Sequence, residues 1–182
     1  MVISSSSSGT QTADVKFSSA LIPTRSLMFY TLTAAGPVFV IVAALLFLRP
    51  NKHILLTLSL LGALISAGAL GRLLYDLTMD IAGYPDFKLP VWAVFYLIIY
   101  VVLFFMFVFF GLQSGSPGVY FGGIADPALL DSLYISLTNY IGVSPDPSIT
   151  LKTPLPRFLS VTQGFISMFI NVVIITKFVN TF

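Results

Sequence analysis

The chain has 182 residues, of which 57% are hydrophobic and 9% are charged, and its formal net charge is +2. A soluble domain carries about 25% charged residues, so this composition predicts an integral membrane protein with several spans. The small net charge provides no basic field for nucleic acid. The chain has no cysteine and one histidine, His53, which excludes disulfides, thiolate metal sites and histidine-rich metal or haem sites within one chain. We therefore expect no cofactor and no metal.

The N-terminal half divides into a polar tail and a transmembrane hairpin. Residues 1–26 include the serine run Ser4–Ser8 and lack the basic start and apolar core of a secretory signal, so we expect a disordered tail. The hairpin covers residues 27–79. Its two apolar stretches, Leu27–Leu48 and Ile54–Leu77, are each long enough for a span of about 20 residues.

Small side chains recur along one face of the second span. Ser59, Ala63, Ala67 and Gly71 occupy every fourth position. Small residues at this spacing let another helix approach closely in lipid. The pattern predicts a packing stripe, whose partner is either another helix of the chain or another subunit.

The C-terminal half contains two further spans. A polar linker, residues 80–90, leads into the third span, Val91–Leu112. The Gly- and Ser-rich segment Gln113–Ala125 follows, and the fourth span is predicted at Phe158–Phe178. The predicted fold class is thus all-α, with four transmembrane helices.

Between the third and fourth spans, the sequence predicts a helix too short to cross a bilayer. Asp126-Pro127 is typical of a helix start, with an N-cap acid followed by proline at the first helical position. The apolar pattern continues to Tyr140, and the turn Ile141–Pro147 follows. Irregular backbone at membrane depth is tolerated only where protein buries it or where it lines a cavity. We therefore expect a re-entrant segment next to a pore or a binding site.

The fourth span carries one polar stripe. Gln163, Ser167 and Asn171 lie at i, i+4 and i+8 on an otherwise apolar helix. They are candidates for lining a cavity. The alternative is hydrogen bonding between helices, worth about 0.6 kcal/mol per contact in a membrane.

The order of these parts resembles the pore module of the potassium-channel superfamily. The matching segments are Tyr134–Thr138, the Gly/Pro turn ending in Asp146, and Thr153–Leu159. In that family a pore helix of the type Y-F-S-L-T-T leads into the filter T-V-G-Y-G-D, and T-P-L-G-R opens the inner helix. The resemblance implies that residues 91–182 form a pore-loop module with outer helix, turret, pore helix, filter-like turn and inner helix. The filter-like positions it implies are Thr138, Asn139, Tyr140, Ile141, Gly142, Val143, Ser144, Pro145 and Asp146.

The filter signature itself differs from that of the family. Gly142 is the one glycine where the family has two, and glycine permits the φ values that aim successive carbonyls at the axis. Pro145 fixes φ near −65° and disrupts such a stack. The segment from Asp146 to Arg157 is also longer than is usual in the family. The resemblance therefore does not imply potassium selectivity.

These observations predict a channel-like membrane protein rather than an enzyme. We expect a cation pore of weak or unknown selectivity, built as a homo-tetramer in the lipid bilayer, with a monovalent cation as the candidate ion. The alternative is a non-conducting accessory or scaffold subunit of a complex with unlike membrane partners. Arg49 and Lys52 favour a cytoplasmic first turn, whereas the count over all basic residues places both termini inside.

Overall fold

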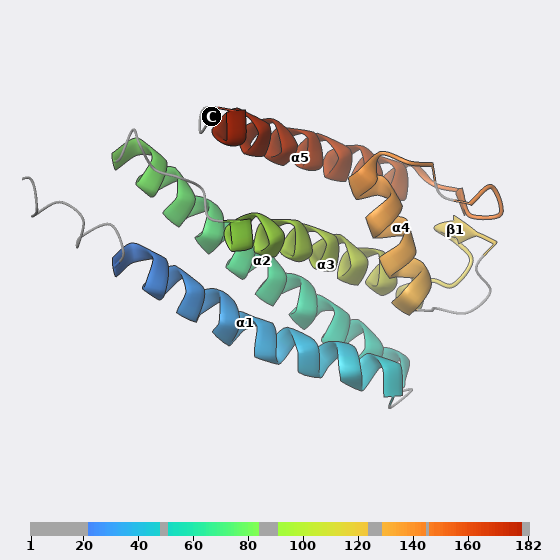
Figure 1. Ribbon diagram of the computed structural model, residues 1–182. Helices are drawn as coiled ribbons and strands as arrows, with labels where there is room; N and C mark the ends of the chain where they lie inside the picture. Colours follow the sequence, from blue (N-terminus) through green and yellow to red (C-terminus); the bar gives the residue numbers. More distant parts are fainter. Residues whose placement is uncertain (1–21, 48–50, 84–90, 124–128, 145, 180–182) are drawn as a thin grey trace, which may run out of the picture.

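A computed structural model describes residues 22–47, 51–83, 91–123, 129–144 and 146–179 of the chain. These residues form five helices and two short strands (Figure 1). In chain order the elements are α1 (Ile22–Phe47), α2 (Lys52–Gly83), α3 (Val91–Gly115), β1 (Phe121–Gly122), α4 (Leu129–Ile141), β2 (Thr150–Leu151) and α5 (Pro154–Val179).

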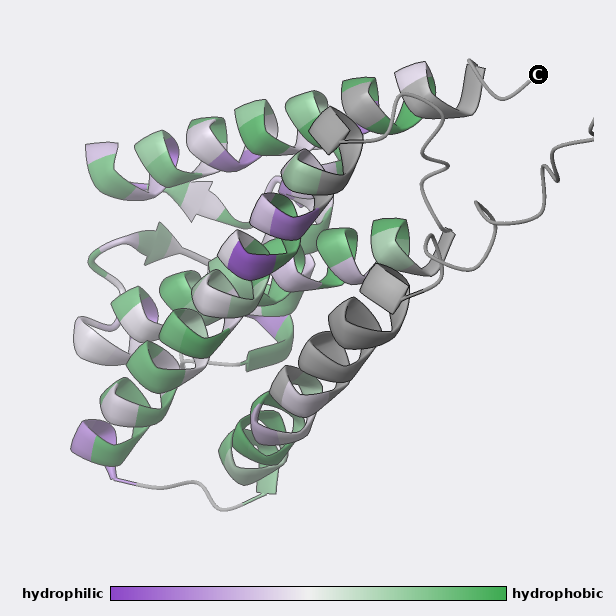
Figure 2. Ribbon diagram, turned by 90° about the vertical axis from the view of Figure 1, so that its left-hand side faces the viewer, coloured by the Kyte–Doolittle hydropathy of each residue, from purple (hydrophilic) through white to green (hydrophobic). Residues whose placement is uncertain are grey.

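Three of these helices are long and apolar enough to cross a membrane. The qualifying stretches are Lys52–Asp76 in α2, Ala93–Gly115 in α3 and Pro154–Thr176 in α5. In α1 the stretch that qualifies by composition is shorter, Ala35–Phe47, among the residues searched. Figure 2 shows hydrophobic residues distributed along the long helices. Length and composition together indicate a membrane-embedded protein.

The helices begin and end near the predicted boundaries but generally run further. Helix α1 starts at Ile22, inside the predicted tail, and stays continuous through Pro37. Residues 1–21 lie outside the described part of the chain. Helix α2 continues past Leu77 to Gly83, because no proline interrupts the stretch before residue 84. The ends of a helix fray and are located less precisely than the helix itself. Differences of a few residues from the predicted boundaries are therefore expected.

Helix α2 packs against both α1 and α3, and its small residues face α3. A Cβ at Gly62 would lie 2.7 Å from the Phe107 ring, and the Ser59 hydroxyl donates a hydrogen bond to the Phe107 carbonyl. Of the predicted stripe, Ser59 and Ala63 are buried, whereas Ala67 and Gly71 are exposed. The close approach therefore covers the first half of the stripe, and its partner is the third predicted span.

Helix α4 packs against α3 and α5 at one end of the molecule (Figure 1). Two apolar clusters meet on α3. One joins α1, α2, α3 and the start of α4, through residues such as Ile41 and Phe107. The other joins α3, α4 and α5 with one residue each from α2 and β1, through residues such as Phe105, Ile135 and Ile170. Because α3 contributes to both clusters, it fixes α4 relative to the hairpin.

A pair of two-residue strands, not expected from the sequence, closes the end of the molecule beside α4. Strands β1 and β2 are antiparallel, with Phe121 opposite Leu151 and Gly122 opposite Thr150. Gly123 follows with φ +82°, where a Cβ would lie 1.9 Å from the Ser148 carbonyl oxygen. Only glycine fits such a position, so the segment after α3 lies directly against the segment before α5.

Candidate functional site

The short helix α4 is amphipathic, and its buried face points at α3 and α5. The buried positions recur at helical spacing and include small polar side chains: Leu129, Ser132, Ile135, Ser136 and Tyr140. Asp131 lies in the first turn, where a negative charge complements the helix dipole. The predicted cap Asp126-Pro127 falls outside the described residues.

The C-terminal end of α4 is closed by its own turn. The Val143 N–H donates to the Thr138 carbonyl at 2.9 Å, and the Gly142 N–H donates to the Asn139 carbonyl at 3.3 Å. With φ +78° at Gly142, this is a Schellman motif, in which glycine adopts a left-handed conformation just past the helix. The glycine of the predicted filter-like turn therefore acts here as a helix cap.

The second half of the turn is organised by Asp146. Its Oδ1 accepts a hydrogen bond from the Ser148 N–H at 2.8 Å, and its carbonyl accepts one from the Ile149 N–H at 2.8 Å. The Ser148 backbone N–H holds the pKa of the Asp146 carboxyl below its ordinary value, and a side-chain bond from Ser148 adds to the effect. The carboxylate thus caps its own loop while remaining exposed.

Gln163 joins α5 to the middle of α4. Its Nε2 donates to the Ser136 carbonyl at 2.8 Å and to the Ser136 hydroxyl at 2.9 Å. That hydroxyl in turn donates to the Val102 carbonyl on α3 at 2.8 Å. Gln163 and Ser136 are fully buried, so one polar chain connects three helices inside the apolar core. Within one chain, the Gln163 side chain therefore makes hydrogen bonds between helices, which is the alternative to lining a cavity.

The other members of the predicted stripe lie in different surroundings. The Ser167 side chain is buried, and its hydroxyl donates to the Gly164 carbonyl of its own helix at 3.1 Å. Asn171 is exposed, and its Oδ1 accepts a hydrogen bond from the Tyr140 hydroxyl at 3.3 Å. Asn171 therefore lies at the exposed edge of the interface with α4, whereas the Ser167 hydroxyl bonds only within α5.

A third polar contact joins the last turn of α4 to α5. The Asn139 Nδ2 donates to the Ser160 hydroxyl at 3.0 Å. The Thr138 hydroxyl instead bonds back to the Tyr134 and Ile135 carbonyls of its own helix. Nothing in the sequence marks Ser136 or Ser160 as a hydrogen-bond partner of another helix. Their small polar side chains at helical spacing are weak signals, because serine in a membrane helix often bonds only to its own backbone.

The turn and the outer face of α4 present mostly apolar side chains. Ile141 is 70% exposed and Val143 is 56% exposed, and Ser144 is exposed beside them. Pro145 lies outside the described residues. On α4, the other exposed large residues are Leu130, Tyr134 and Leu137. No element of the described chain covers this face.

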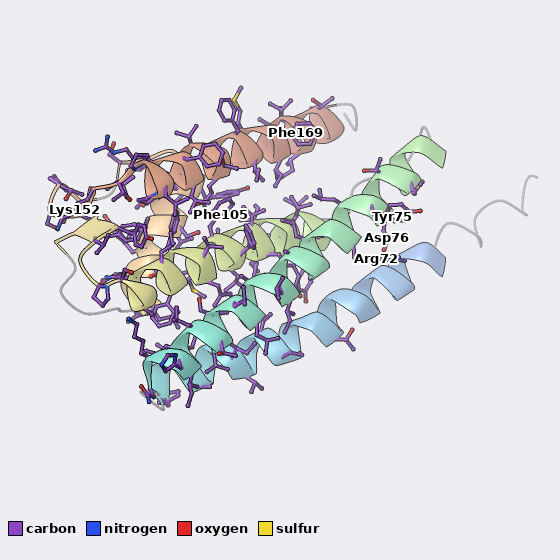
Figure 3. All side chains as sticks on the ribbon, turned by 180° about the vertical axis from the view of Figure 1, so that it is seen from behind. Arg72, Tyr75, Asp76, Phe105, Lys152 and Phe169 are labelled. Atoms are coloured by element: carbon purple, nitrogen blue, oxygen red, sulfur yellow. The ribbon has the colours of Figure 1, made fainter. Side chains whose placement is uncertain are left out.

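Basic side chains fix the segment between the turn and α5. The Lys152 Nζ donates to the Gly118 carbonyl at 3.0 Å, and the Arg157 Nε donates to the Leu151 carbonyl at 3.0 Å. Figure 3 shows Lys152 at the opposite end of the molecule from Arg72 and Asp76. These two pair on α2 at 3.0 Å, as expected for an i, i+4 pair.

Two grooves lie on α3, away from α5. One, of about 520 Å³, is between α1 and α3 beside Gly36, Tyr96 and Tyr100, and it is almost wholly apolar. The other, of about 440 Å³, is between α2 and α3 beside Ser59 and Gly111. Neither contains a predicted site residue. Among the described side chains, no group of three or more His, Cys, Asp or Glu is arranged to hold a metal ion.

Comparison with known proteins adds no relative: no family model, no curated protein and no solved structure matches the chain. The function of the candidate site is therefore inferred from its geometry.

Proposed function

We propose that the chain is a pore-loop subunit of a cation channel of weak selectivity. The observation that carries this proposal is the half-length helix α4, which α3 and α5 hold by a buried hydrogen-bond chain and which is followed by irregular backbone at 142–144 and 146–149. A helix of 13 residues rises about 20 Å, too short to cross a bilayer core of about 30 Å. A short helix fixed between two long apolar helices is the arrangement expected of a re-entrant segment.

In this proposal the chain crosses the membrane four times. Helix α1 has 26 residues and is about 39 Å long, which suffices for a span alongside α2, α3 and α5. The hairpin α1–α2 then flanks the module α3–α4–α5. This order of parts also agrees with the resemblance to the potassium-channel pore module.

The uncovered face of α4 supports an oligomer. Its exposed apolar residues, such as Leu137 and Ile141, adjoin a turn whose backbone is irregular. Irregular backbone at membrane depth needs a protein or water-filled surrounding rather than lipid. A second copy of the chain provides such a surface, and one module contributes only a sector of an ion path. We therefore propose a homo-tetramer.

The test is to reconstitute the full chain in liposomes and to measure K⁺ and Na⁺ efflux, together with the mass of the detergent-solubilised complex. We expect efflux above that of empty vesicles and a mass of four copies. Leu137→Asn on the uncovered face of α4 should lower both, whereas the apolar control Leu137→Met should change neither. A monomer that gives no efflux contradicts the proposal.

A second candidate function is an accessory subunit of a complex with unlike membrane proteins. The exposed aromatic side chains of α5, including Phe158, Phe165 and Phe169, favour this candidate because they offer a large contact surface. Co-purification with a fixed set of unlike partners, without efflux from liposomes, would support it.

A further inference from the structure

The groove between α2 and α3 becomes more polar toward one end. Apolar side chains such as Leu60 and Phe107 line its deeper part, and Ser116 and Tyr120 line its outer part. This outer part lies at the same end of the molecule as the start of α2 (Figure 1). A tyrosine at the end of a span is typical of the membrane–water interface. The groove therefore opens at the membrane surface and extends into the apolar layer.

A lysine lies at the outer end of the groove. Lys52 precedes Leu56, which lines the groove, by one helical turn, so both residues occupy the same face of α2. Lys52 is exposed and is the first residue of the stretch of α2 that is long and apolar enough to cross a membrane. Among the described residues, no carboxylate pairs with its ammonium group. Its positive charge complements an anionic group at the level of the lipid headgroups.

The dimensions of the groove match one hydrocarbon chain in one leaflet. From Lys52 to Ala63, α2 rises about 17 Å, close to half of a hydrocarbon core of about 30 Å. The volume of about 440 Å³, spread over the roughly 10 Å from Leu56 to Ala63, corresponds to a cross-section of roughly 40 Å². This is about half the cross-section of a helix with a diameter of about 10 Å. A helix of a second copy therefore does not fit into the groove, whereas a flexible hydrocarbon chain does.

We propose that the groove between α2 and α3 binds an anionic phospholipid. One acyl chain lies against Leu60 and Phe107, and the headgroup phosphate lies at Lys52. The hydroxyl groups of Ser116 and Tyr120 are donors for the oxygens of the headgroup. Because all phospholipids have acyl chains, the charge at Lys52 determines which headgroup is preferred. The site uses no residue of α4 or of the turn after it, so the inference is independent of the proposed pore.

The test is a lipid titration of the purified, delipidated full-length protein in mild detergent, followed by native mass spectrometry. The two probes are dioleoyl phosphatidylglycerol, which is anionic, and dioleoyl phosphatidylcholine, which is zwitterionic and has the same chains. We expect one saturable lipid per chain and an affinity about fivefold higher for the anionic lipid, the effect of one lysine near an anionic group. Lys52→Gln should remove this preference, whereas Lys52→Arg keeps the charge and should preserve it.

A second pair of variants tests where the acyl chain lies. Leu60→Trp fills the groove and should weaken the binding of both lipids. Its control is Leu61→Trp, since Leu61 is also exposed but does not line the groove, and this variant should bind both lipids like the unchanged protein.

Three results would overturn the inference. The first is a preference for the anionic lipid that survives in Lys52→Gln. The second is unchanged lipid binding in Leu60→Trp, because the lipid then lies elsewhere on the protein. The third is a loss of oligomeric mass in Leu60→Trp with lipid binding intact, which would assign the groove to a second copy of the chain.

Discussion

At the scale of single residues, the candidate site depends on backbone conformation and buried hydrogen bonds. Gly142 closes the end of α4, and Gln163 connects α5 through Ser136 to α3. The Ser136 hydroxyl and the Gln163 Nε2 each have a hydrogen-bond partner, and an unsatisfied group in an apolar surrounding would be expensive. The Gln163 Oε1 is the exception in this chain of bonds: it is buried without a hydrogen-bond partner.

Ser136→Ala should destabilise the protein more than the same change in the exposed turn. It removes the bond to the Val102 carbonyl and one of the two acceptors of Gln163. Single polar contacts in membrane proteins contribute about 0.6 kcal/mol and at most about 1.7 kcal/mol, which sets the expected loss. Denaturant unfolding in mild detergent measures it. The control Ser144→Ala should have no measurable effect, and an equal loss in both variants would contradict the assigned network.

Lowering the pH should weaken the turn through Asp146. Its pKa lies below the ordinary value because the ionised carboxylate accepts the Ser148 N–H. The stabilisation is therefore complete above the unfolded pKa and is lost as the pH falls through the lower, folded pKa. Carbon NMR of the labelled carboxyl measures this titration.

The matched variants for this titration are at Ser148. Ser148→Pro removes the backbone N–H and should return the pKa of Asp146 toward its ordinary value. Ser148→Ala keeps that N–H, so the pKa should remain below the ordinary value. If the proline variant titrates like the unchanged protein, the bond is not the cause.

At the scale of elements, the contact between α2 and α3 determines where the candidate site lies relative to the hairpin. Small residues on α2 allow the aromatic side chains of α3 to approach, and α3 then positions α4 through its opposite face. Gly62 lies directly against the Phe107 ring, so close that no side chain fits between them. A change there should affect the fold although it is far from α4 in sequence.

Gly62→Ala and Gly68→Ala should shift stability in opposite directions. A Cβ at Gly62 would lie 2.7 Å from the Phe107 ring, and such overpacking costs about 1–3 kcal/mol. A Cβ at Gly68 would meet nothing within 4 Å, and alanine is the better helix former by about 1 kcal/mol. Thermal unfolding of the two variants compares them. Equal stability would contradict the α2–α3 packing.

At the scale of the whole molecule, the loops gather at two opposite ends. The start of α2, the two strands and the turn after α4 lie at one end, and the ends of α2 and α5 lie at the other (Figure 1). The contact of Gly115 with Leu56 confirms that the end of α3 lies beside the start of α2. In a membrane, these two ends face opposite sides.

Single cysteines introduced into the cysteine-free chain should report this arrangement. Asn51→Cys and Ser148→Cys should react with a membrane-impermeant maleimide from the same side of sealed vesicles. Met79→Cys, about 40 Å along α2 from its start, should react from the other side. Labelling of Asn51→Cys and Ser148→Cys from opposite sides would contradict the arrangement.

The sequence by itself determined the features that depend on local composition. Three of the predicted spans and the short helix lie close to where the sequence places them, because stretches of about 20 apolar residues and the Gly/Pro turns that bound them are local signals. The i, i+4, i+8 spacing of Gln163, Ser167 and Asn171 was also visible in the sequence.

Only the tertiary structure decided which groups meet. It directs Gln163 to Ser136, 27 residues earlier, and it pairs Gly122 with Thr150 through strands too short to leave a pattern. It also assigns Gly142 to a helix cap, since that role depends on which carbonyls the turn folds over. Hydropathy predicts which helices lie in the membrane. Which face of a helix meets a given neighbour depends on long-range packing, and a short stretch of sequence does not contain that information.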